Sequence, residues 1–274
     1  MPGQTISILG CGWLGFPLGK FLVQKGFSVK GSTTAPEKLQ LLKENRIIPF
    51  LLNFPQTPSA QFQEFFDADI LFLNVPFKRA LPDAQIYRQQ IQSIVSCVQN
   101  SHVKRVIFAS STSIYPETNG VVDETTGFDQ ANPRAVVLAG IEEMLLANKN
   151  FCTTILRFAG LFGSDRGIGS FFKKIRREKL SNAPVNLIHR EDCIQIVDRI
   201  IQQDISGEIF NACCDAHPLR KDLYERFLSA DCLKSVEFVP PQERSYKIVS
   251  NQKLKQMLSY RFIYPNPLDV AANQ

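Results

Sequence analysis

Three glycines near the start of the chain have a spacing that could hold a phosphate group. Gly10, Gly12 and Gly15 follow a short apolar run and precede a stretch with apolar residues at helical spacing. In such a strand-to-helix turn the first glycine permits the bend, the second lets the backbone approach a pyrophosphate, and the third lets helix and strand pack closely. The pattern predicts a dinucleotide-binding turn that includes Trp13 and Leu14. A tight turn without a cofactor is the alternative.

A second group of polar residues follows an apolar stretch in the middle of the chain. Ser110, Ser111, Thr112 and Ser113 come directly after the run that begins at Val103. Doubly wound sheets bind their ligands at the carboxyl ends of the strands. We therefore expect these hydroxyls at a ligand site, with Ser110 among the cofactor-binding residues.

The end of the second predicted strand indicates which dinucleotide is preferred. An NAD-selective site places an Asp or Glu about 20 residues after the turn, where it accepts from the ribose 2′-hydroxyl. Here the first acid is Glu37, and Lys30 and Lys38 lie nearby. The hydroxyl residues of this stretch are Ser32, Thr33 and Thr34. These side chains could accept a 2′-phosphate, so NADP is the preferred cofactor, and NAD is the alternative if both lysines are simply solvated.

Strand and helix patterns alternate through the first two-thirds of the chain. Strands are predicted at 5–9, 27–31, 47–53, 69–75, 103–110, 153–158 and 207–212. Helices are predicted at 16–24, 36–45, 60–66, 83–100 and 132–148, and from about 192 to 203. The alternation predicts an α/β fold with a Rossmann-type doubly wound parallel sheet. Asn53, Val75 and Pro76, at the ends of two strands, complete the predicted cofactor-binding set.

Beyond Gly163 the predicted helices and strands become shorter. We expect residues 1–164 to form the dinucleotide-binding domain, with 185–215 returning to it. Residues 165–184 and 216–274 would then form a smaller second region. A basic segment, 171–180, is predicted as an exposed helix face, and a site for an anionic substrate is the alternative.

Composition excludes several classes of function. The 274 residues carry a net charge of +5, which is too modest to indicate a nucleic-acid partner. The seven cysteines form no Cys-x-x-Cys pair and the three histidines lie far apart, so a metal site is not predicted. No apolar stretch has the length of a membrane span, and no secretory leader is visible. We expect a cytoplasmic protein whose partners are a dinucleotide and a small molecule.

Four further segments resemble the extended short-chain dehydrogenase/reductase family, the NAD-dependent epimerase/dehydratase group, and the resemblance covers nearly the whole chain. They are Val106-Ile-Phe-Ala-Ser-Ser111-Thr-Ser-Ile-Tyr115 with Val122-Asp-Glu124, Leu156-Arg-Phe-Ala-Gly-Leu-Phe-Gly163, Asn186-Leu-Ile-His189-Arg-Glu-Asp192 and Gly207-Glu-Ile-Phe-Asn211. The resemblance implies a Rossmann domain, a nicotinamide cofactor and a small C-terminal substrate domain, which makes 165–184 and 216–274 the expected substrate-binding region.

The chain departs from this family at its catalytic pair. The family uses a Ser or Thr with Tyr-x-x-x-Lys, and Ser111 matches the serine, but none of the six tyrosines is followed by lysine at the fourth position. A helix glutamate commonly lies eight residues after that tyrosine. If Glu143 is that glutamate, Ala135 and Ala139 replace the pair; if it is Glu142, the replacements are Arg134 and Leu138. This departure is typical of atypical members such as the YeeZ-like group.

Two functions remain open. The first is an oxidoreductase or epimerase acting on a nucleotide sugar or a small hydroxylated metabolite, with Ser111 bound to the substrate oxygen. Tyr115 and His189 are candidates for proton exchange; the alternatives are a packed aromatic at a strand end and a hydrogen-bonded core histidine. The second function is a cofactor-binding sensor or regulatory partner protein without turnover, which the loss of the tyrosine and the lysine would favour.

Overall fold

A computed structural model describes residues 3–54, 60–77, 84–163, 166–168, 178–228, 236–242 and 245–270. The chain divides into two compact units. Unit 1 comprises residues 1–110, 130–156 and 197–209, and unit 2 comprises 111–129, 157–196 and 210–274. These units reflect packing, whereas the predicted division into 1–164 with 185–215, and 165–184 with 216–274, concerns which residues hold cofactor and substrate. That division stays a prediction.

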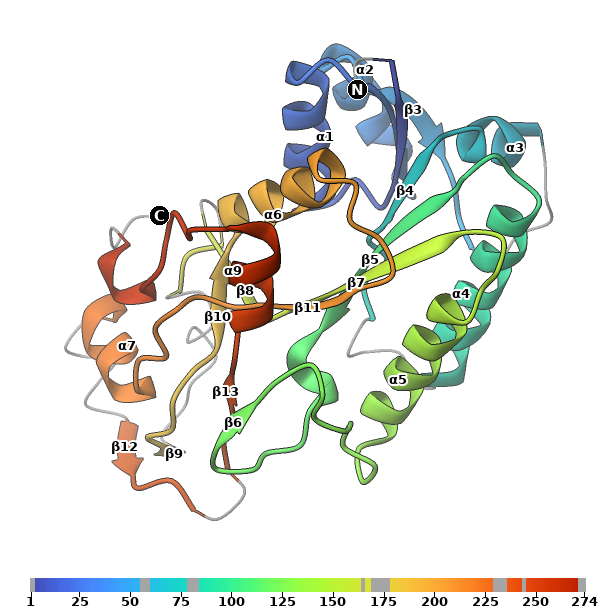
Figure 1. Cartoon of the computed structure of the whole chain (residues 1–274). Coiled ribbons are helices and arrows are strands. Elements are labelled where there is room, and N and C mark those ends of the chain that lie inside the picture. The colour runs from blue at the N-terminus through green and yellow to red at the C-terminus, as the bar shows by residue number, and fades with distance from the viewer. Residues whose placement is uncertain are drawn as a thin grey trace. The chain divides into compact units, whose positions relative to one another are not determined.

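A seven-stranded sheet forms the framework and has the order β11-β7-β5-β4-β1-β2-β3 (Figure 1). Its strands are β1 (Thr5–Leu9), β2 (Ser28–Thr33), β3 (Ile48–Leu51), β4 (Ile70–Leu73), β5 (Arg105–Ser111), β7 (Cys152–Phe158) and β11 (Ile209–Ala212). β1 pairs in parallel with β2 and β4, and the pairs β2–β3 and β4–β5 are also parallel. The strand order is that of a doubly wound nucleotide-binding sheet, so the predicted Rossmann-type α/β fold is confirmed.

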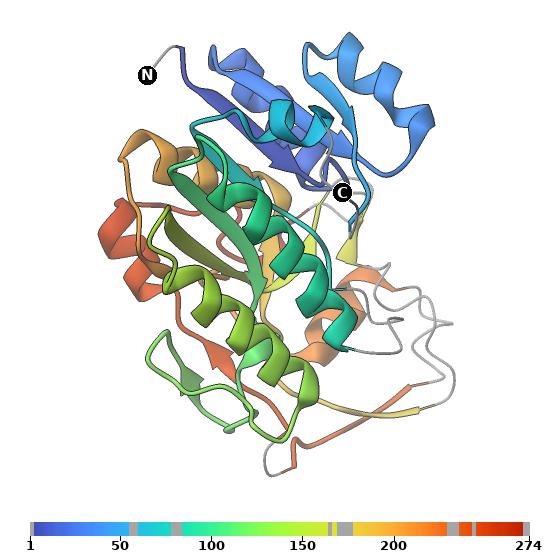
Figure 2. The ribbon, with the colours of Figure 1, turned by 90° about the vertical axis from the view of Figure 1, so that its right-hand side faces the viewer.

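Helices cover the sheet because their apolar faces need burial. They are α1 (Gly15–Gln24), α2 (Leu39–Glu44, after a 3₁₀ turn over Pro36–Lys38), α3 (Ala60–Phe66), α4 (Ala84–Gln99), α5 (Pro133–Leu146) and α6 (Arg190–Gln202). In unit 1, α4 and α5 lie side by side on one face, and α1 packs against β1 and β2 (Figure 2). Leu18 and Leu22 of α1 are fully buried, as its apolar spacing predicts. Within the described residues, no helix has the length and apolar character needed to cross a membrane.

Unit 2 has shorter elements around a core of its own. Three parallel strand pairs join β6 (Val121–Val122) to β13 (Ile248–Val249), β8 (Gly160–Phe162) to β10 (Leu187–His189), and β9 (Glu178–Ser181) to β12 (Val236–Val239). Its described residues also include the helices α7 (Arg220–Phe227) and α9 (Gln252–Leu258) and 3₁₀ turns over Thr112–Ile114 and Pro267–Asp269. Its buried cluster contains Phe162, Ile168, Leu187, Cys214, Leu223 and Val270.

The described part of the basic segment 171–180 is a strand, whereas a helix was predicted. Residues 171–177 lie outside the described residues, but Lys179 and Leu180 belong to strand β9. Lys179 pairs with Glu237 of β12, and its Nζ lies 3.6 Å from the Glu237 carboxylate. The helix prediction is therefore wrong for 178–180, because pairing with a distant strand overrides the local charge pattern.

Candidate functional site

At two positions of the turn between β1 and α1, contacts within the protein leave no room for a side chain larger than that of glycine. Gly10 has a φ of +107°, and a Cβ there would collide with the carbonyl of Asn74. A Cβ at Gly15 would collide with the carbonyl of Gly10 and would lie 3.1 Å from the Ile8 side chain. These contacts account for the bend and for the close packing of α1 on β1 in the glycine turn, Gly10–Gly15.

Gly12 differs, because no such contact requires it. It is exposed, its φ is not in the left-handed region, and no described atom lies within 4 Å of the position its Cβ would take. The first turn of α1 carries no acidic side chain, so an anion there would meet the positive end of the helix dipole without repulsion. The turn therefore fits a pyrophosphate that approaches the backbone at Gly12.

Neighbouring strands fix the backbone of the turn. The Gly10 amide donates to Ser32 Oγ at 3.0 Å, and the Cys11 amide donates to the Ser32 carbonyl at 2.8 Å. Asn74 Nδ2 donates to the Gly10 carbonyl at 3.0 Å. Sequence reasoning missed Asn74, although a polar residue that directly follows the buried β4 was a usable signal. Ser32 is only 3 % exposed, so it supports the turn as a buried hydrogen-bond acceptor.

The other predicted cofactor-binding residues lie at the ends of β1, β3 and β4 or beside them. Trp13 is half-buried, whereas the Leu14 side chain is buried. Asn53 and Pro76 are exposed. Val75 is half-buried, and its carbonyl accepts from Tyr87 Oη at 2.9 Å. The structure leaves their part in binding a prediction.

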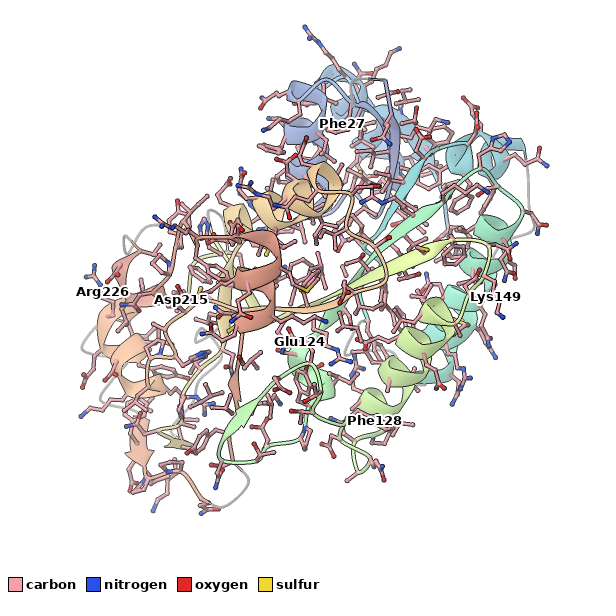
Figure 3. All side chains as sticks on the ribbon, viewed as in Figure 1. Phe27, Glu124, Phe128, Lys149, Asp215 and Arg226 are labelled. Atoms are coloured by element: carbon pink, nitrogen blue, oxygen red, sulfur yellow. The ribbon has the colours of Figure 1, made fainter. Side chains whose placement is uncertain are left out.

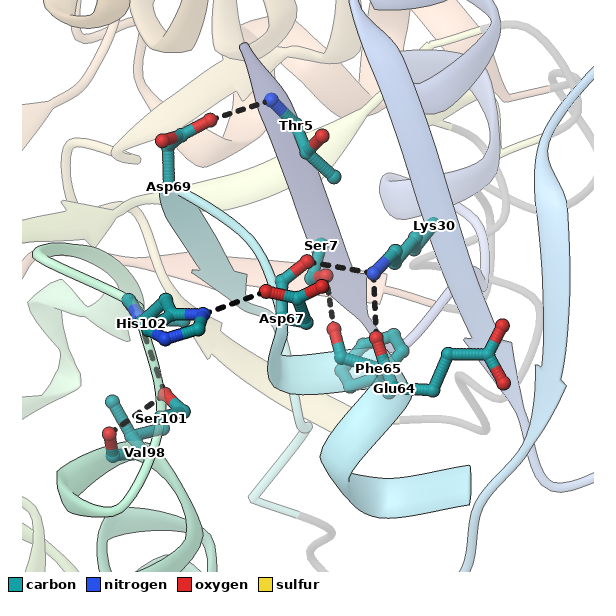
Figure 4. A network of polar contacts seen from close by, with 11 residues as sticks. Thr5, Ser7, Lys30, Glu64, Phe65, Asp67, Asp69, Val98, Ser101 and His102 are labelled. Atoms are coloured by element: carbon teal, nitrogen blue, oxygen red, sulfur yellow. Dashed lines mark hydrogen bonds and ion pairs between the residues drawn. The ribbon is translucent and has the colours of Figure 1, made fainter. Parts of the chain in front are cut away.

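The residues considered for a 2′-phosphate separate into two groups. Thr33 is buried and its Oγ1 accepts from the Ala35 amide at 3.1 Å, whereas Thr34 and Lys38 are exposed. Lys30 is buried beneath α3, where its Nζ donates to the carbonyls of Glu64 at 2.5 Å and Asp67 at 2.6 Å (Figure 4). Its ammonium binds the carboxyl end of that helix, so the role in phosphate binding considered for Lys30 is wrong.

A buried carboxylate meets the predicted cofactor residue at the end of β5. Ser110 Oγ donates to Glu142 Oε1 at 2.5 Å, and Glu142 is only 3 % exposed. Glu143, the next residue of α5, is exposed. The inward-facing glutamate is therefore Glu142. If it corresponds to the family's helix glutamate, Arg134 and the buried Leu138 stand where the family has tyrosine and lysine.

Ser111 lies at the end of β5 and begins unit 2. It is half-buried, and its Oγ accepts from the Ser113 amide at 3.1 Å, which caps the 3₁₀ turn over Thr112–Ile114. A hydroxyl that accepts in this way still has its own proton to donate. The geometry therefore allows Ser111 to donate a hydrogen bond to a substrate oxygen.

Tyr115 belongs to a closed set of buried contacts, here called the tyrosine network, with Arg157, Asn211 and Glu124. Its Oη donates to Asn211 Oδ1 at 2.8 Å and accepts from Arg157 Nη1 at 2.7 Å. The backbone N–H of Asn211 donates to Glu124 Oε1 at 2.7 Å; Glu124 is labelled in Figure 3. Burial raises the pKa of Tyr115, and the Arg157 guanidinium opposes that rise. Tyr115 is 1 % exposed, a placement that resembles the packed-aromatic alternative.

His189 is also enclosed, at the start of α6. Its Nδ1 accepts from the Glu191 amide at 3.2 Å, so the ring caps the helix. Its ring centroid lies 3.7 Å from that of Tyr264, and a Cβ at Gly163 would lie 2.6 Å from its Nε2. Burial and then the nearby Arg190 lower the pKa of His189 to about 4, so the ring is neutral at pH 7. Catalysis by Tyr115 or His189 stays a prediction.

Comparison with known proteins identifies relatives along the full chain. No profile of a known protein family matches it. It is 32 % identical to the protein YeeZ of Escherichia coli strain K12, over 97 % of this chain and 98 % of YeeZ. A UDP-glucuronic acid 4-epimerase of Bacillus cereus, solved with NAD, is similar in structure with a TM-score of 0.76 and 18 % identity, covering 97 % and 95 % of the two chains.

A short-chain dehydrogenase/reductase superfamily protein of Agrobacterium tumefaciens with bound NAD has the same fold. Its TM-score is 0.74 at 14 % identity, and the match covers 94 % of this chain and 92 % of that one. At such identities the two solved structures show the shared fold, while the similarity to YeeZ is close enough to show family membership.

Proposed function

The chain belongs to the YeeZ-like group of atypical short-chain dehydrogenases/reductases, and we propose that it binds a nicotinamide dinucleotide on the glycine turn of unit 1. Gly12 carries this proposal, because protein packing requires glycine at positions 10 and 15 but not at position 12. A pyrophosphate in close contact with the backbone would explain why position 12 is also a glycine. The NAD named with the Bacillus cereus and Agrobacterium tumefaciens structures supports the same cofactor class.

Two matched glycine variants test the cofactor site. Neither Gly12 nor Gly127 has a left-handed φ, and a Cβ at either position meets no described atom within 4 Å. We expect Gly12→Val and Gly127→Val to retain the wild-type melting temperature. Only Gly12→Val should lose dinucleotide affinity, by about 100-fold, which corresponds to about 2.7 kcal/mol. Loss in both variants, or in neither, would contradict the site.

The chain offers its own probe for this measurement. Trp13 is the single tryptophan and lies within the glycine turn. Binding of NADH or NADPH should quench its emission and transfer energy to the reduced nicotinamide. The titration therefore needs no substrate and no knowledge of the reaction.

We further propose that the preferred cofactor is NADP. The end of β2 carries no acidic residue to accept from a ribose 2′-hydroxyl, and the first acid is the exposed Glu37 in the following 3₁₀ turn. Because the Lys30 ammonium bonds the carbonyls of Glu64 and Asp67, Thr34 and Lys38 are the exposed residues of this stretch that could meet a 2′-phosphate. Support for NADP therefore rests on these two residues.

The proposed activity is that of an oxidoreductase or epimerase on a nucleotide sugar or a small hydroxylated metabolite. A bound nicotinamide cofactor would supply hydride transfer. Ser111 would donate a hydrogen bond to the substrate oxygen and orient it. Loss of a general acid or base of the tyrosine kind costs about 100- to 10,000-fold in rate, so turnover would be slow rather than absent.

A second candidate is a protein that binds the dinucleotide and reports it to a partner without turnover. The enclosure of Tyr115 and His189 favours it, because both are buried and hydrogen-bonded. The two candidates separate in one comparison: oxidation of hydroxylated compounds by the loaded protein supports the enzyme. A partner captured only by the loaded form, with no oxidation, supports the sensor.

A further inference from the structure

If Glu142 corresponds to the helix glutamate of the typical family pattern, Arg134 stands at the position of that pattern's tyrosine. Arg134 is the second residue of α5, and the Asn132 side chain accepts from its amide at the helix N-cap. Its side chain is half-buried, so a small molecule can reach it. Four residues later, Leu138 is apolar and buried and supplies no cation. The positive charge that the family places on lysine is therefore found one helical turn earlier.

The guanidinium of Arg134 is held in one orientation by an aromatic stack. Its Cζ lies 3.7 Å from the centroid of the Phe77 ring, and its Nη2 donates to the Phe77 carbonyl at 2.8 Å. The Phe77 ring in turn stacks on Tyr87, with centroids 4.4 Å apart and planes inclined by 10°. Tyr87 donates to the Val75 carbonyl at 2.9 Å. The stack fixes both the cation and the backbone that follows β4.

This backbone adjoins the proposed cofactor turn within unit 1. β4 pairs with β1 in parallel register, Leu73 beside Leu9, and Asn74 bonds the Gly10 carbonyl. The segment 75–77 therefore leaves the sheet at the same carboxyl edge as the glycine turn. Arg134 accordingly lies at the ligand-binding edge of the unit.

An arginine at this position changes the chemistry that the position can perform. Its guanidinium stays protonated, so it cannot exchange a proton as a tyrosine does. A guanidinium carries five N–H donors in a planar fork that matches carboxylate and phosphate oxygens, and in Arg134 one of them donates to the Phe77 carbonyl. Stacking on an aromatic ring orients such a fork without removing its charge. We propose that Arg134 is a substrate-binding residue for an anionic oxygen group, so that the substrate is a hydroxylated metabolite bearing a carboxylate or a phosphate.

The test builds on the proposed cofactor site and uses the NADPH-loaded protein. The probes are D-glucuronate, D-glucose 6-phosphate and D-glucose, which distinguish a carboxylate, a phosphate and a neutral sugar. Their binding is followed by nicotinamide emission excited through Trp13. We expect one of the two anions to bind at least about tenfold more tightly than glucose. Equal binding of all three, or no binding of any, would overturn the proposal.

Three variants assign any preference to this side chain. Arg134→Gln should reduce the preference for the anion to within about twofold, while Arg134→Lys should keep part of it because the charge remains. Arg88→Gln removes an exposed arginine from the neighbouring α4 and should change nothing. NADPH affinity and melting temperature should stay near wild type in Arg88→Gln. The Arg134 variants also change the contacts with Phe77, so sugar binding is measured at saturating NADPH and compared as the ratio of anion to glucose affinity within each variant. A preference that survives in Arg134→Gln would refute the assignment, whereas failure of wild type to bind NADPH would refute the proposed function before any sugar is added.

Discussion

The glycine turn of unit 1 and the tyrosine network of unit 2 differ in how far the protein satisfies its own polar groups. At the turn, the protein encloses Gly10 and Gly15 and leaves Gly12 exposed. In the network, the donors and acceptors of Tyr115 meet Arg157 and Asn211 inside the core. An open backbone can accept a ligand at little cost, whereas a closed network would have to be broken first.

This contrast bears on how an atypical member of the family works. Dinucleotide binding depends on local backbone geometry, and that geometry is present in the turn. Proton transfer depends on side chains that can reach a substrate, and Tyr115 and His189 are enclosed. Cofactor binding and proton transfer are therefore separable in this chain.

The largest expected effect is a loss of folding stability at acidic pH caused by the enclosed His189. The folded-state pKa of His189 is lowered from 6.5 to about 4, so the unfolded chain binds a proton more readily between these values. The stabilisation is complete above pH 6.5 and declines as the pH falls toward 4. The loss should reach about 3 kcal/mol, measured by urea unfolding at several pH values.

A variant at the same position isolates this contribution. His189→Asn keeps an acceptor for the Glu191 amide but does not titrate. Burial raises the pKa of Asp192, which acts in the opposite direction, but Asp192 is present in both proteins and its effect cancels in the difference. If the variant showed the same decline as wild type, His189 would be an accessible, normally titrating group and the contrast would fail for it.

Removing the hydroxyl of Tyr115 should cost less. Tyr115→Phe leaves the Asn211 Oδ1 and Arg157 Nη1 atoms without this partner, which should lower the free energy of unfolding by about 2 kcal/mol. Dinucleotide affinity, read from Trp13, should stay within about twofold of wild type because the Tyr115 hydroxyl bonds Asn211 and Arg157 and not the glycine turn.

Tyr260→Phe is the matched control, since Tyr260 is also buried and donates to Asp192 at 2.7 Å. Both variants should lose similar stability. A loss of turnover of about 100-fold or more in Tyr115→Phe alone would show that Tyr115 exchanges protons during the reaction, and the network would then have to open.

Local constraints made the turn and the sheet predictable from the sequence. The bend at Gly10 and the apolar runs of the strands depend on residues close in the chain. Lys30 could not be placed in this way, because its partners lie 34 and 37 residues further on. The choice between Glu142 and Glu143 was equally hidden, since which of two adjacent residues faces inward depends on how α5 packs against the rest of unit 1.

Lys38 and Lys30, on either side of the end of β2, should differ in their effect on the preference for NADPH over NADH, and this is the smallest effect expected. Lys38 is exposed after β2, whereas Lys30 is buried beneath α3. Lys38→Met should reduce the ratio of NADPH to NADH affinity by about fivefold, because one exposed cation contributes about 1 kcal/mol to a phosphate contact. Lys30→Met should leave that ratio unchanged and lower stability instead, because the carbonyls of Glu64 and Asp67 lose their donor. Competitive titration with Trp13 emission measures the affinity ratio, and a thermal melt measures the stability. A wild type that prefers NADH would refute the NADP assignment. A changed ratio in Lys30→Met would show that Lys30 does contribute to the phosphate site.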